Sequence, residues 1–543
     1  MIKKNDIITA EIIDYSSDGN GVARYENMVI FVPFTAVGDL CEIKIVKVLS
    51  GYSFGRCEKV ITPSADRITP VCPISRQCGG CDFQHISYEA EKRAKHNFVK
   101  SVFERIAKLD CPVLETRSCD ESARYRNKAQ FPVGCDENGK AVTGFYARRS
   151  HRVIPCEDCL LQPVQLNEIA QYTVFLLNQL GIKAYNEEKR NGIVRHIYLR
   201  KAWVTGQIML CLVCTKADFP KKDELCRLLN EKFEDITTIV INVNSKNTNV
   251  ILGEKNYPVY GDGKITDILC GVEIEISPHS FYQVNHDGAQ ELYTIAKDSL
   301  NLTEDDVLLD MYCGTGSIGL SMADKVKQLV GVEIVPQAVE NAKINAKKMG
   351  FENARFICAD AKEAAKMLLE ENFLPTAVVV DPPRKGCDED TLNAIISMNV
   401  PKISMISCNH ATAARDCKYL AEHGYKVEFV QPFDMFPRTK HVETVVLLSQ
   451  QKPDDVIEVD LNLDELDITS AESKATYQEI KDYVLKEFGL KVSTLYISQI
   501  KRKCGIDVGE HYNISQKENQ KVPQCPKEKE DAIRAALEHF AMI

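Results

Sequence analysis

Long apolar runs are missing from this sequence of 543 residues, although 44% of its residues are hydrophobic. No stretch reaches the roughly 18 consecutive apolar residues that a membrane-spanning helix needs. The first residues, MIKKNDIITAEIID, also lack the apolar segment of a secretory signal peptide. The sequence therefore predicts a cytoplasmic protein, and its length suggests roughly three or four domains.

A surplus of basic charge is missing as well, because 67 Lys and Arg stand against 77 Asp and Glu. Proteins that bind nucleic acid usually carry a basic footprint, so this average argues mildly against such a partner. The acidity is partly C-terminal, however. Residues 61–160 carry 16 Lys and Arg against 13 Asp and Glu, whereas residues 454–543 carry 12 against 18. The average therefore conceals a mildly basic region in the first third of the chain.

Cysteine is abundant, with 21 residues. A reducing compartment does not keep structural disulfides, so free thiols, a metal cluster or a nucleophile are expected. The loop CPISRQCGGC (72–81) has the spacing C-x5-C-x2-C, and a fourth thiol from Cys156 or Cys159 would complete an iron-sulfur or zinc site. Cys211 and Cys214 are three residues apart on an expected strand, so they face opposite sides and are predicted to be core residues.

The patterning divides the chain into four parts. Short alternating strands with Gly and Asn turns predict a small OB-like barrel, and cysteine loops mixed with strands and helices follow it. Strands then alternate with helices, which predicts a parallel, doubly wound sheet. An acidic linker and helices complete the chain. The expected ranges are 1–62, 66–270 with a helix near 88–108 suited to packing on the next domain, 271–450, and 454–543.

A glycine-rich turn marks the expected cofactor site. DVLLDMYCGTGSIGL places Gly314, Gly316 and Gly319 in a G-x-G-x-x-G spacing after an apolar strand, and Glu333 ends the next strand. Such a turn lets backbone N–H groups approach a ligand, and the acidic residue can hold a ribose. Dinucleotide oxidoreductases and S-adenosylmethionine enzymes share this arrangement. The turn alone therefore does not choose between them.

The fourth strand separates these alternatives. AVVVDPPRKG ends in Asp381 followed by two prolines, which stiffen the exit of the strand. A rigid carboxylate at the carboxyl edge of the sheet is typical of methyltransferases that act on planar nitrogen or base substrates. This loop argues against an oxidoreductase.

The next strand, KISMIS, leads to Cys408 at the same edge. Taken alone, such a cysteine is more often a core residue. A uracil C5 is a poor nucleophile, but a thiolate that adds to C6 turns the ring into an enolate whose C5 can attack a methyl group. A base must then remove the C5 proton, and Asp434, His441 and Glu443 are candidates in FDMFPRTKHVET. Taken alone, Glu443 is more often a solvated strand end.

Ordered motifs along the chain resemble the RNA 5-methyluridine methyltransferases, and in particular the 23S rRNA (uracil-5-)-methyltransferases with a TRAM domain and an iron-sulfur cluster. The resemblance covers about residues 1–450. One departure is SCNHA, where many relatives have proline in place of His410. The motifs are YRNKAQFPVG, SHRVIPCEDCLLQ, GIVRHIYLR, HSFYQVN, DMYCGTG, GVEIV, VVDPPRKG, SCNHATAARDCKYL and DMFPRTKHVET.

The resemblance implies an α/β fold, with a Rossmann-like methyltransferase domain preceded by a TRAM barrel and a mixed α+β iron-sulfur domain, and followed by a short helical extension. It makes Cys408 the nucleophile and Glu443 the base. S-adenosylmethionine would lie among Gln283, Tyr312, Glu333 and Asp381. A 4Fe-4S cluster would be held by Cys72, Cys78, Cys81 and Cys159, with Cys156 as an alternative fourth ligand.

The expected substrate is RNA, with the target uridine in a loop or flipped out of its stack. The resemblance favours 23S rRNA, because tRNA-specific relatives commonly lack the barrel and the cluster cysteines; the tRNA thymine loop is the alternative. RYRNK (124–128) and YARRSHR (146–152) are candidate RNA contacts, although solvated faces look similar. A non-catalytic RNA-binding factor is the rival from another class, and the intact Cys408 and Glu443 argue against it.

Overall fold

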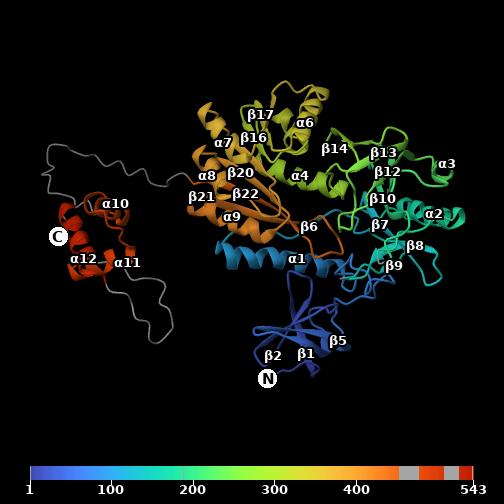
Figure 1. Ribbon diagram of the computed structural model, residues 1–543, viewed down its shortest axis with the longest axis horizontal. Coiled ribbons are helices and arrows are strands. Elements are labelled where there is room, and N and C mark those ends of the chain that lie inside the picture. The colour runs from blue at the N-terminus through green and yellow to red at the C-terminus, as the bar shows by residue number, and fades with distance from the viewer. Residues whose placement is uncertain (1, 149, 188, 452–475, 507–524, 541) are drawn as a thin grey trace. The chain divides into compact units, whose positions relative to one another are not determined.

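The structure, a computed structural model, describes residues 2–148, 150–187, 189–451, 476–506, 525–540 and 542–543 (Figure 1). The chain forms two compact units, Met1–Asp454 and Asp455–Ile543. The acidic linker expected at 454–467 lies outside the described residues, as does Arg149 of the second basic motif. Within the described residues, no helix combines the length and the apolar character needed to cross a membrane.

The N-terminal strands form a closed barrel in the order β1-β2-β3-β5-β4, as the alternation of apolar and polar residues predicts. Inward-facing side chains such as Ile12, Ile30 and Ile43 are fully buried. Gly21 lies where an added Cβ would come within 2.1 Å of the Thr35 hydroxyl, so no larger residue fits this crossing. The strands are β1 (Ile7–Tyr15), β2 (Gly21–Tyr25), β3 (Met28–Val32), β4 (Leu40–Val48) and β5 (Tyr52–Thr62).

A seven-stranded sheet follows, in the order β13-β12-β11-β10-β7-β8-β9, with α2 (Val164–Leu180) and α3 (Lys222–Lys232) packed against it. Cys211 and Cys214 are fully buried in β11 and belong to different core clusters, so the prediction that they are core residues is confirmed. The strands are β7 (Lys128–Cys135), β8 (Ala141–Tyr146), β9 (Val153–Pro155), β10 (Val194–Lys201), β11 (Ile208–Cys214), β12 (Ile236–Val243) and β13 (Lys255–Tyr260).

The third sheet has the order β18-β17-β16-β19-β20-β22-β21-β6. Its first five strands are parallel and carry helices on both faces, as predicted, whereas β21 and β22 form an antiparallel hairpin at the far end. A two-residue strand from far upstream, β6 (Arg117–Ser118), extends this edge. The others are β16 (Val307–Met311), β17 (Gln328–Glu333), β18 (Ala354–Cys358), β19 (Ala377–Val380), β20 (Lys402–Ser407), β21 (Tyr425–Asp434) and β22 (Glu443–Gln450).

Helices cover this sheet in two layers. On one face of the sheet, α4 packs on the strands through residues such as Leu292 and Val445. On the opposite face, α7, α8 and α9 pack on the strands. A short β14–β15 hairpin lies beside α4. The elements are α4 (His286–Leu300), α5 (Ser317–Leu320), α6 (Pro336–Lys348), α7 (Ala361–Glu370), α8 (Glu389–Ser397), α9 (His410–Glu422), β14 (Ile265–Leu269) and β15 (Val272–Ile276).

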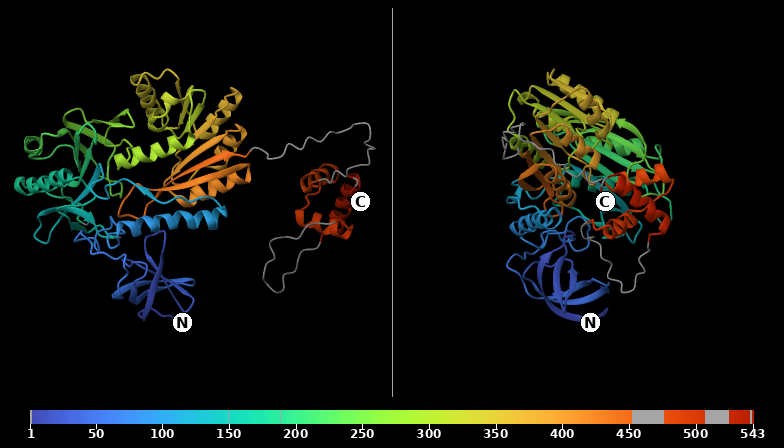
Figure 2. Two further views of the ribbon diagram at one scale, coloured as in Figure 1. Left: turned by 180° about the vertical axis from the view of Figure 1, so that it is seen from behind. Right: turned by 90° about the vertical axis from the view of Figure 1, so that its left-hand side faces the viewer.

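Helix α1 (Tyr88–Val102) crosses from the barrel to this sheet. It begins at Ser87, whose hydroxyl accepts the N–H of Ala90, and its apolar side packs on α9 and β21. Val99 and Phe103 are buried in the same core cluster as Leu420. Figure 2 shows α1 lying along the sheet domain on the side that faces the barrel. A segment from the first fifth of the chain is therefore part of the core of this sheet domain.

The second unit has three helices with a core of their own among the described residues, including Ile480, Ile497 and Leu537. Its first helix begins with a capping box, in which Thr476 and Glu479 bond each other's backbone N–H groups. The helices are α10 (Tyr477–Phe488), α11 (Thr494–Lys503) and α12 (Lys527–His539).

Candidate active site

The turn after β16 has the sharp shape that the glycine spacing predicts. Tyr312, Gly314 and Gly316 have positive φ angles of 67°, 55° and 84°. The Gly314 N–H donates to one oxygen of Glu333 (3.0 Å), and the Val335 N–H donates to the other (2.9 Å). The carboxylate at the end of β17 therefore anchors the turn at the end of β16.

Asp310 lies beneath this turn and was missed by sequence reasoning. Its Oδ2 accepts the Gly319 N–H at 2.8 Å, whereas Oδ1 is buried and has no hydrogen-bond partner among the described residues. Burial raises the pKa of this carboxyl to about 8. An Asp within the apolar strand VLLDM was the available signal, because a buried acid needs a reason to be there.

Cys408 and Glu443 meet at one edge of the sheet. In the antiparallel register of β20 and β22, Ser407 pairs with Thr444. Cys408 follows Ser407, and Glu443 precedes Thr444, so the thiol and the carboxylate leave two adjacent strand ends. The charge of Glu443 is one cause of the raised pKa of Cys408, second to burial.

Asp381 joins this pair from the neighbouring strand β19. Burial raises its pKa to about 7. The Glu443 side chain is buried, and burial together with the charge of Asp381 raises its pKa to about 8. The Arg384 guanidinium opposes the upward shift at both Cys408 and Glu443. The three strands β19, β20 and β22 thus bring a thiol and two carboxyls together beside one cation.

The turn after Cys408 is firmly held. The Asn409 side chain accepts the Ala411 N–H (3.1 Å) to cap α9, and its Nδ2 donates to the Arg384 carbonyl (3.2 Å). His410 stacks on Phe98 of α1, with ring centroids 6.4 Å apart. This stacking holds His410, the residue where the sequence departs from the family pattern, against α1.

The other candidate bases are placed differently. Asp434 is fully buried, and its oxygens accept hydrogen bonds from Lys95 Nζ (2.6 Å) and the Tyr88 hydroxyl (3.0 Å). His441 packs edge-on against Phe436. Of the three, Glu443 has the largest electrostatic effect on Cys408, whose pKa its charge raises.

Gln283 and Tyr312 make contacts on different helices. The Gln283 side chain bonds the Tyr293 hydroxyl, whose pKa burial and Asp381 raise, so Gln283 is near the same carboxyl edge. The Tyr312 hydroxyl donates to Thr391 of α8 at 3.5 Å. All four residues expected around the cofactor therefore border the turn or the edge beside it.

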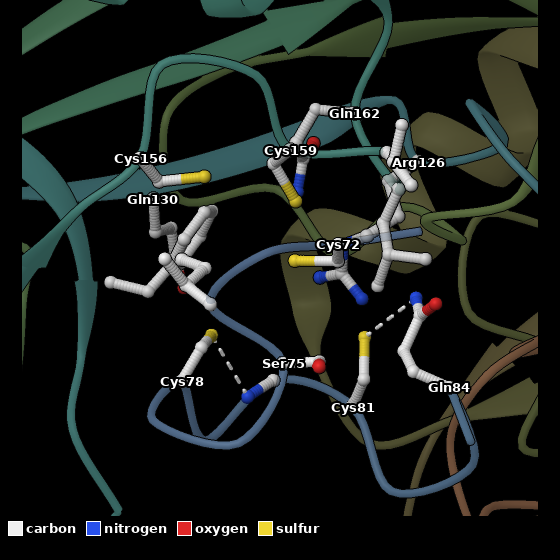
Figure 3. A pocket seen from close by; sticks show the side chains of 15 residues that line it. Cys72, Ser75, Cys78, Cys81, Gln84, Arg126, Gln130, Cys156, Cys159 and Gln162 are labelled. Carbon is white, nitrogen blue, oxygen red and sulfur yellow. Dashed lines mark hydrogen bonds between the residues drawn. The ribbon is translucent and has the colours of Figure 1, made fainter. Parts of the chain in front are cut away.

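Five cysteines line one cavity of about 240 Å³ (Figure 3). The first three come from the 72–81 loop and the other two from the segment after β9. Burial raises the pKa of the Cys81 and Cys156 thiols to about 12 and that of Cys159 to about 11. The cysteines are Cys72, Cys78, Cys81, Cys156 and Cys159.

These thiols surround the cavity rather than converge on a point. Among the described residues, no three His, Cys, Asp or Glu side chains are close enough to hold one metal ion. A single zinc ion needs its ligands to converge, whereas a four-iron cluster takes its four thiolates on separate irons. The donor set and the cavity therefore fit a cluster better than one ion.

One arginine from each of the two basic motifs supports these cysteine loops. Arg124 donates to Asp158 (2.5 Å) and to the Cys159 carbonyl (3.0 Å). Arg148 donates to the Cys81 carbonyl (2.5 Å) and stacks over Phe34 of the barrel. Two of the arginines that were candidate RNA contacts therefore make contacts within the protein instead.

Comparisons with known proteins agree with this geometry. A family model described as tRNA (Uracil-5-)-methyltransferase matches residues 87–451, and a TRAM domain model matches residues 3–57. An uncharacterized RNA methyltransferase of Halalkalibacterium halodurans is 41% identical over 448 residues, which are 82% of this chain and 98% of the relative. One of Clostridium acetobutylicum is 40% identical over 452 residues, 83% of this chain and 98% of the relative.

A solved structure shares the fold. The Pyrococcus abyssi tRNA (uracil-54, C5)-methyltransferase in complex with S-adenosyl-L-homocysteine has a TM-score of 0.63 and 24% sequence identity. The match covers 81% of this chain and 99% of the Pyrococcus abyssi chain. The Rossmann-like methyltransferase fold and the TRAM barrel predicted from the sequence are thereby confirmed. The chain belongs to the tRNA (uracil-5-)-methyltransferase family of RNA methyltransferases and carries an N-terminal TRAM domain.

Proposed function

We propose that this chain transfers a methyl group from S-adenosylmethionine to C5 of a uridine in 23S rRNA. The observation that carries the proposal is the meeting of Asp381 and Cys408, at the carboxyl ends of β19 and β20, with Glu443 at the amino end of the antiparallel strand β22. A thiol and a buried carboxyl with a raised pKa are the two groups that this reaction needs.

The turn after β16 suits S-adenosylmethionine, which carries a sulfonium and an ammonium charge. Asp310 offers a buried carboxyl oxygen that has no hydrogen-bond partner in the described part of the chain, and Asp381 is close by with a raised pKa. A cationic ligand would stabilise the ionised form of both. Glu333 and Gln283 border the same space, and the Pyrococcus abyssi relative holds S-adenosyl-L-homocysteine.

In the proposed reaction, the Cys408 thiolate forms a bond to C6 of the uracil ring. The resulting enolate attacks the methyl carbon through C5, and the bond from the methyl carbon to sulfur breaks. Glu443 then removes the C5 proton, the C5–C6 double bond re-forms, and the thiolate leaves. The charge of Arg384 acts to lower the pKa of Cys408 and the pKa of Glu443. It therefore favours the thiolate and the carboxylate.

We infer a 4Fe-4S cluster held by Cys72, Cys78, Cys81 and Cys159, with Cys156 as the alternative fourth ligand. Buried thiols with raised pKa values are neutral until a metal displaces their protons, so assembly should release protons. The cluster would act as a structural staple between the two cysteine loops. Protein purified without oxygen should be brown with about four irons per chain; a colourless zinc protein would contradict the inference.

The choice of RNA is tested by mapping 5-methyluridine in 23S rRNA and tRNA from cells with and without the gene. We expect loss of at least one 5-methyluridine from 23S rRNA. Because a tRNA enzyme shares the fold over 81% of this chain, the architecture suits both substrates. Loss from tRNA alone would replace the proposed substrate, and no loss in either RNA would contradict the proposed reaction.

A further inference from the structure

A buried cluster of three charges lies outside the site described so far. The side chains of Lys95, Glu91 and Asp434 each have 0% solvent exposure. Lys95 Nζ donates to Glu91 Oε1 at 2.8 Å, to Asp434 Oδ1 at 2.6 Å and to the Phe436 carbonyl at 3.3 Å. The three donors of the ammonium group are therefore all used.

Such a cluster is weak evidence for stability, because the cost of desolvating buried charges commonly equals or exceeds their attraction. Well-packed apolar residues of similar volume would often stabilise the core as much. A role in fixing one particular arrangement of the chain is the better explanation. The arrangement that the cluster fixes is that of the segment to which its side chains bond.

That segment is residues 435–442, which connect β21 to β22 and which we call the connector. Lys95 holds the Phe436 carbonyl, Asp434 accepts the Phe436 N–H (3.1 Å), and Glu91 accepts the Arg438 N–H (2.7 Å). Arg438 has a positive φ of 70°, which is unfavourable for a residue other than glycine. The cluster thus keeps the connector in a conformation that it would not adopt freely.

The connector leads directly into Glu443. In the hairpin register, Phe433 pairs with Glu443, and Asp434 is the next residue. Asp434, which holds the connector at the end of β21, is therefore adjacent to the proposed base Glu443 at the start of β22. A shift of the connector would move the Glu443 carboxylate relative to Cys408. Cys408 follows a different strand, β20, and in the described part of the chain it forms no hydrogen bond or ion pair with the three charges.

We propose that Lys95 is a positioning residue that sets the place of the Glu443 carboxylate through the connector. The inference rests on the proposed function, in which Glu443 acts only after methyl transfer. Loss of Lys95 should therefore slow the release of methylated RNA while it leaves thiol addition and methyl transfer largely intact. A general loss of structure would slow all of these steps together.

The test uses the full chain and the unmodified RNA transcript, 23S rRNA or tRNA, that the unaltered chain methylates. Lys95→Met keeps the length of the side chain and removes its charge and donors. On this RNA the variant should accumulate a covalent, already methylated adduct, with turnover lowered on the order of tenfold or more. On the same RNA carrying 5-fluorouridine, whose C5 has no proton to remove, the variant should trap the adduct within about twofold of the unaltered rate.

Two further variants keep the outcome decisive. If the single variant unfolds, Glu91→Gln, Lys95→Met and Asp434→Asn can be combined in one chain. The combination removes the three fully buried charges together, and Arg438, 3.9 Å from Glu91, keeps part of its side chain exposed. Slow release in this folded variant supports the proposal, and normal release overturns it. Asp39→Asn breaks the buried pair with Arg67 in the barrel and should leave the ratio of adduct to product unchanged.

The two proposals fail in different ways. If the unaltered chain forms no adduct with 5-fluorouridine RNA, the proposed function fails. If the unaltered chain traps that RNA but Lys95→Met lowers trapping and turnover by the same factor, or changes neither, the positioning role fails while the proposed function stands.

Discussion

The backbone carbonyl of Arg438 accepts hydrogen bonds from the N–H groups of Asp82 (2.9 Å) and Phe83 (3.1 Å). Asp82 directly follows Cys81, and Arg438 is in the middle of the connector that leads to Glu443. The cysteine loop and the segment before the proposed base are therefore bonded backbone to backbone. This contact is a physical link between the cysteine loop and the connector.

Removal of the proposed cluster should loosen this part of the molecule. Protein stripped of iron with a chelator should melt at least about 5 °C lower, because a structural metal site contributes to folding free energy. It should also be cut faster by protease in the 72–83 loop. Cys135→Ser, at an exposed cysteine, is the matched control and should change neither measurement. An unchanged melting temperature in iron-free protein would contradict a structural cluster.

Cys408→Ala should abolish methyl transfer, because it removes the thiolate that is proposed to add to C6. The loss should exceed about a thousandfold, as is usual when a nucleophile is removed. Incorporation of labelled methyl groups into unmodified RNA measures it, and Cys135→Ala should retain normal transfer. Substantial turnover in Cys408→Ala would exclude this residue as the nucleophile.

Glu443→Gln should stop the reaction one step later. The amide keeps the size of the side chain but cannot accept the C5 proton, so the methylated RNA should stay bound to Cys408. A band of protein cross-linked to labelled RNA in a denaturing gel is the expected result. Asp434→Asn should give less of this band, since Asp434 acts through the connector. Free methylated RNA at the normal rate would assign the proton to another base.

The pH dependence of release should report the ionisation of Glu443. Its pKa is raised to about 8, so the carboxyl is mostly protonated at pH 6.5 and mostly ionised at pH 9. A base must be ionised to accept a proton, and the release rate should therefore rise about tenfold per pH unit below 8 and level off above it. Single-turnover decay of the adduct measures this rate. A rate that falls with rising pH would contradict the assignment.

The helical unit after residue 475 should be dispensable for chemistry. The relatives of Halalkalibacterium halodurans and Clostridium acetobutylicum are matched over 98% of their own length by about 82% of this chain, and the family model ends at residue 451. A chain that stops after Gln451 should keep its methyl-transfer rate within about threefold. Single-turnover kinetics with saturating RNA check this. A far larger loss would assign the unit a part in catalysis.

Much of the catalytic edge could be predicted because it follows chain order. Each parallel strand ends at the same edge, so Asp381 and Cys408 could be placed there from the apolar runs before them. The two-residue period of strands likewise predicted the barrel, and it predicted that Cys211 and Cys214 face opposite sides of their strand. Local periodicity carries this information without any long-range contact.

The buried charge cluster could not be predicted, because Asp434 is far in sequence from Glu91 and Lys95. Lys95 and Asp434 are separated by 339 residues. Nothing in the sequence sets Lys95 apart from the other charged residues of its helix, and Asp434 was one of three candidate bases. Arg124 and Arg148 looked like RNA contacts for the same reason, since a sequence does not show which charges find partners inside the fold.

The contribution of α1 to the catalytic core also has a consequence during synthesis. Ribosomes add roughly 5–20 residues per second, so Asp434 emerges about half a minute after Lys95. Throughout that time Val99 and Phe103 have no β21 to pack against. Helix α1, translated directly after the barrel, thus gains its packing partners only when nearly all of the sheet domain has been made. A nascent chain of this protein should be a client of chaperones that bind exposed apolar helices until the final hairpin closes over them.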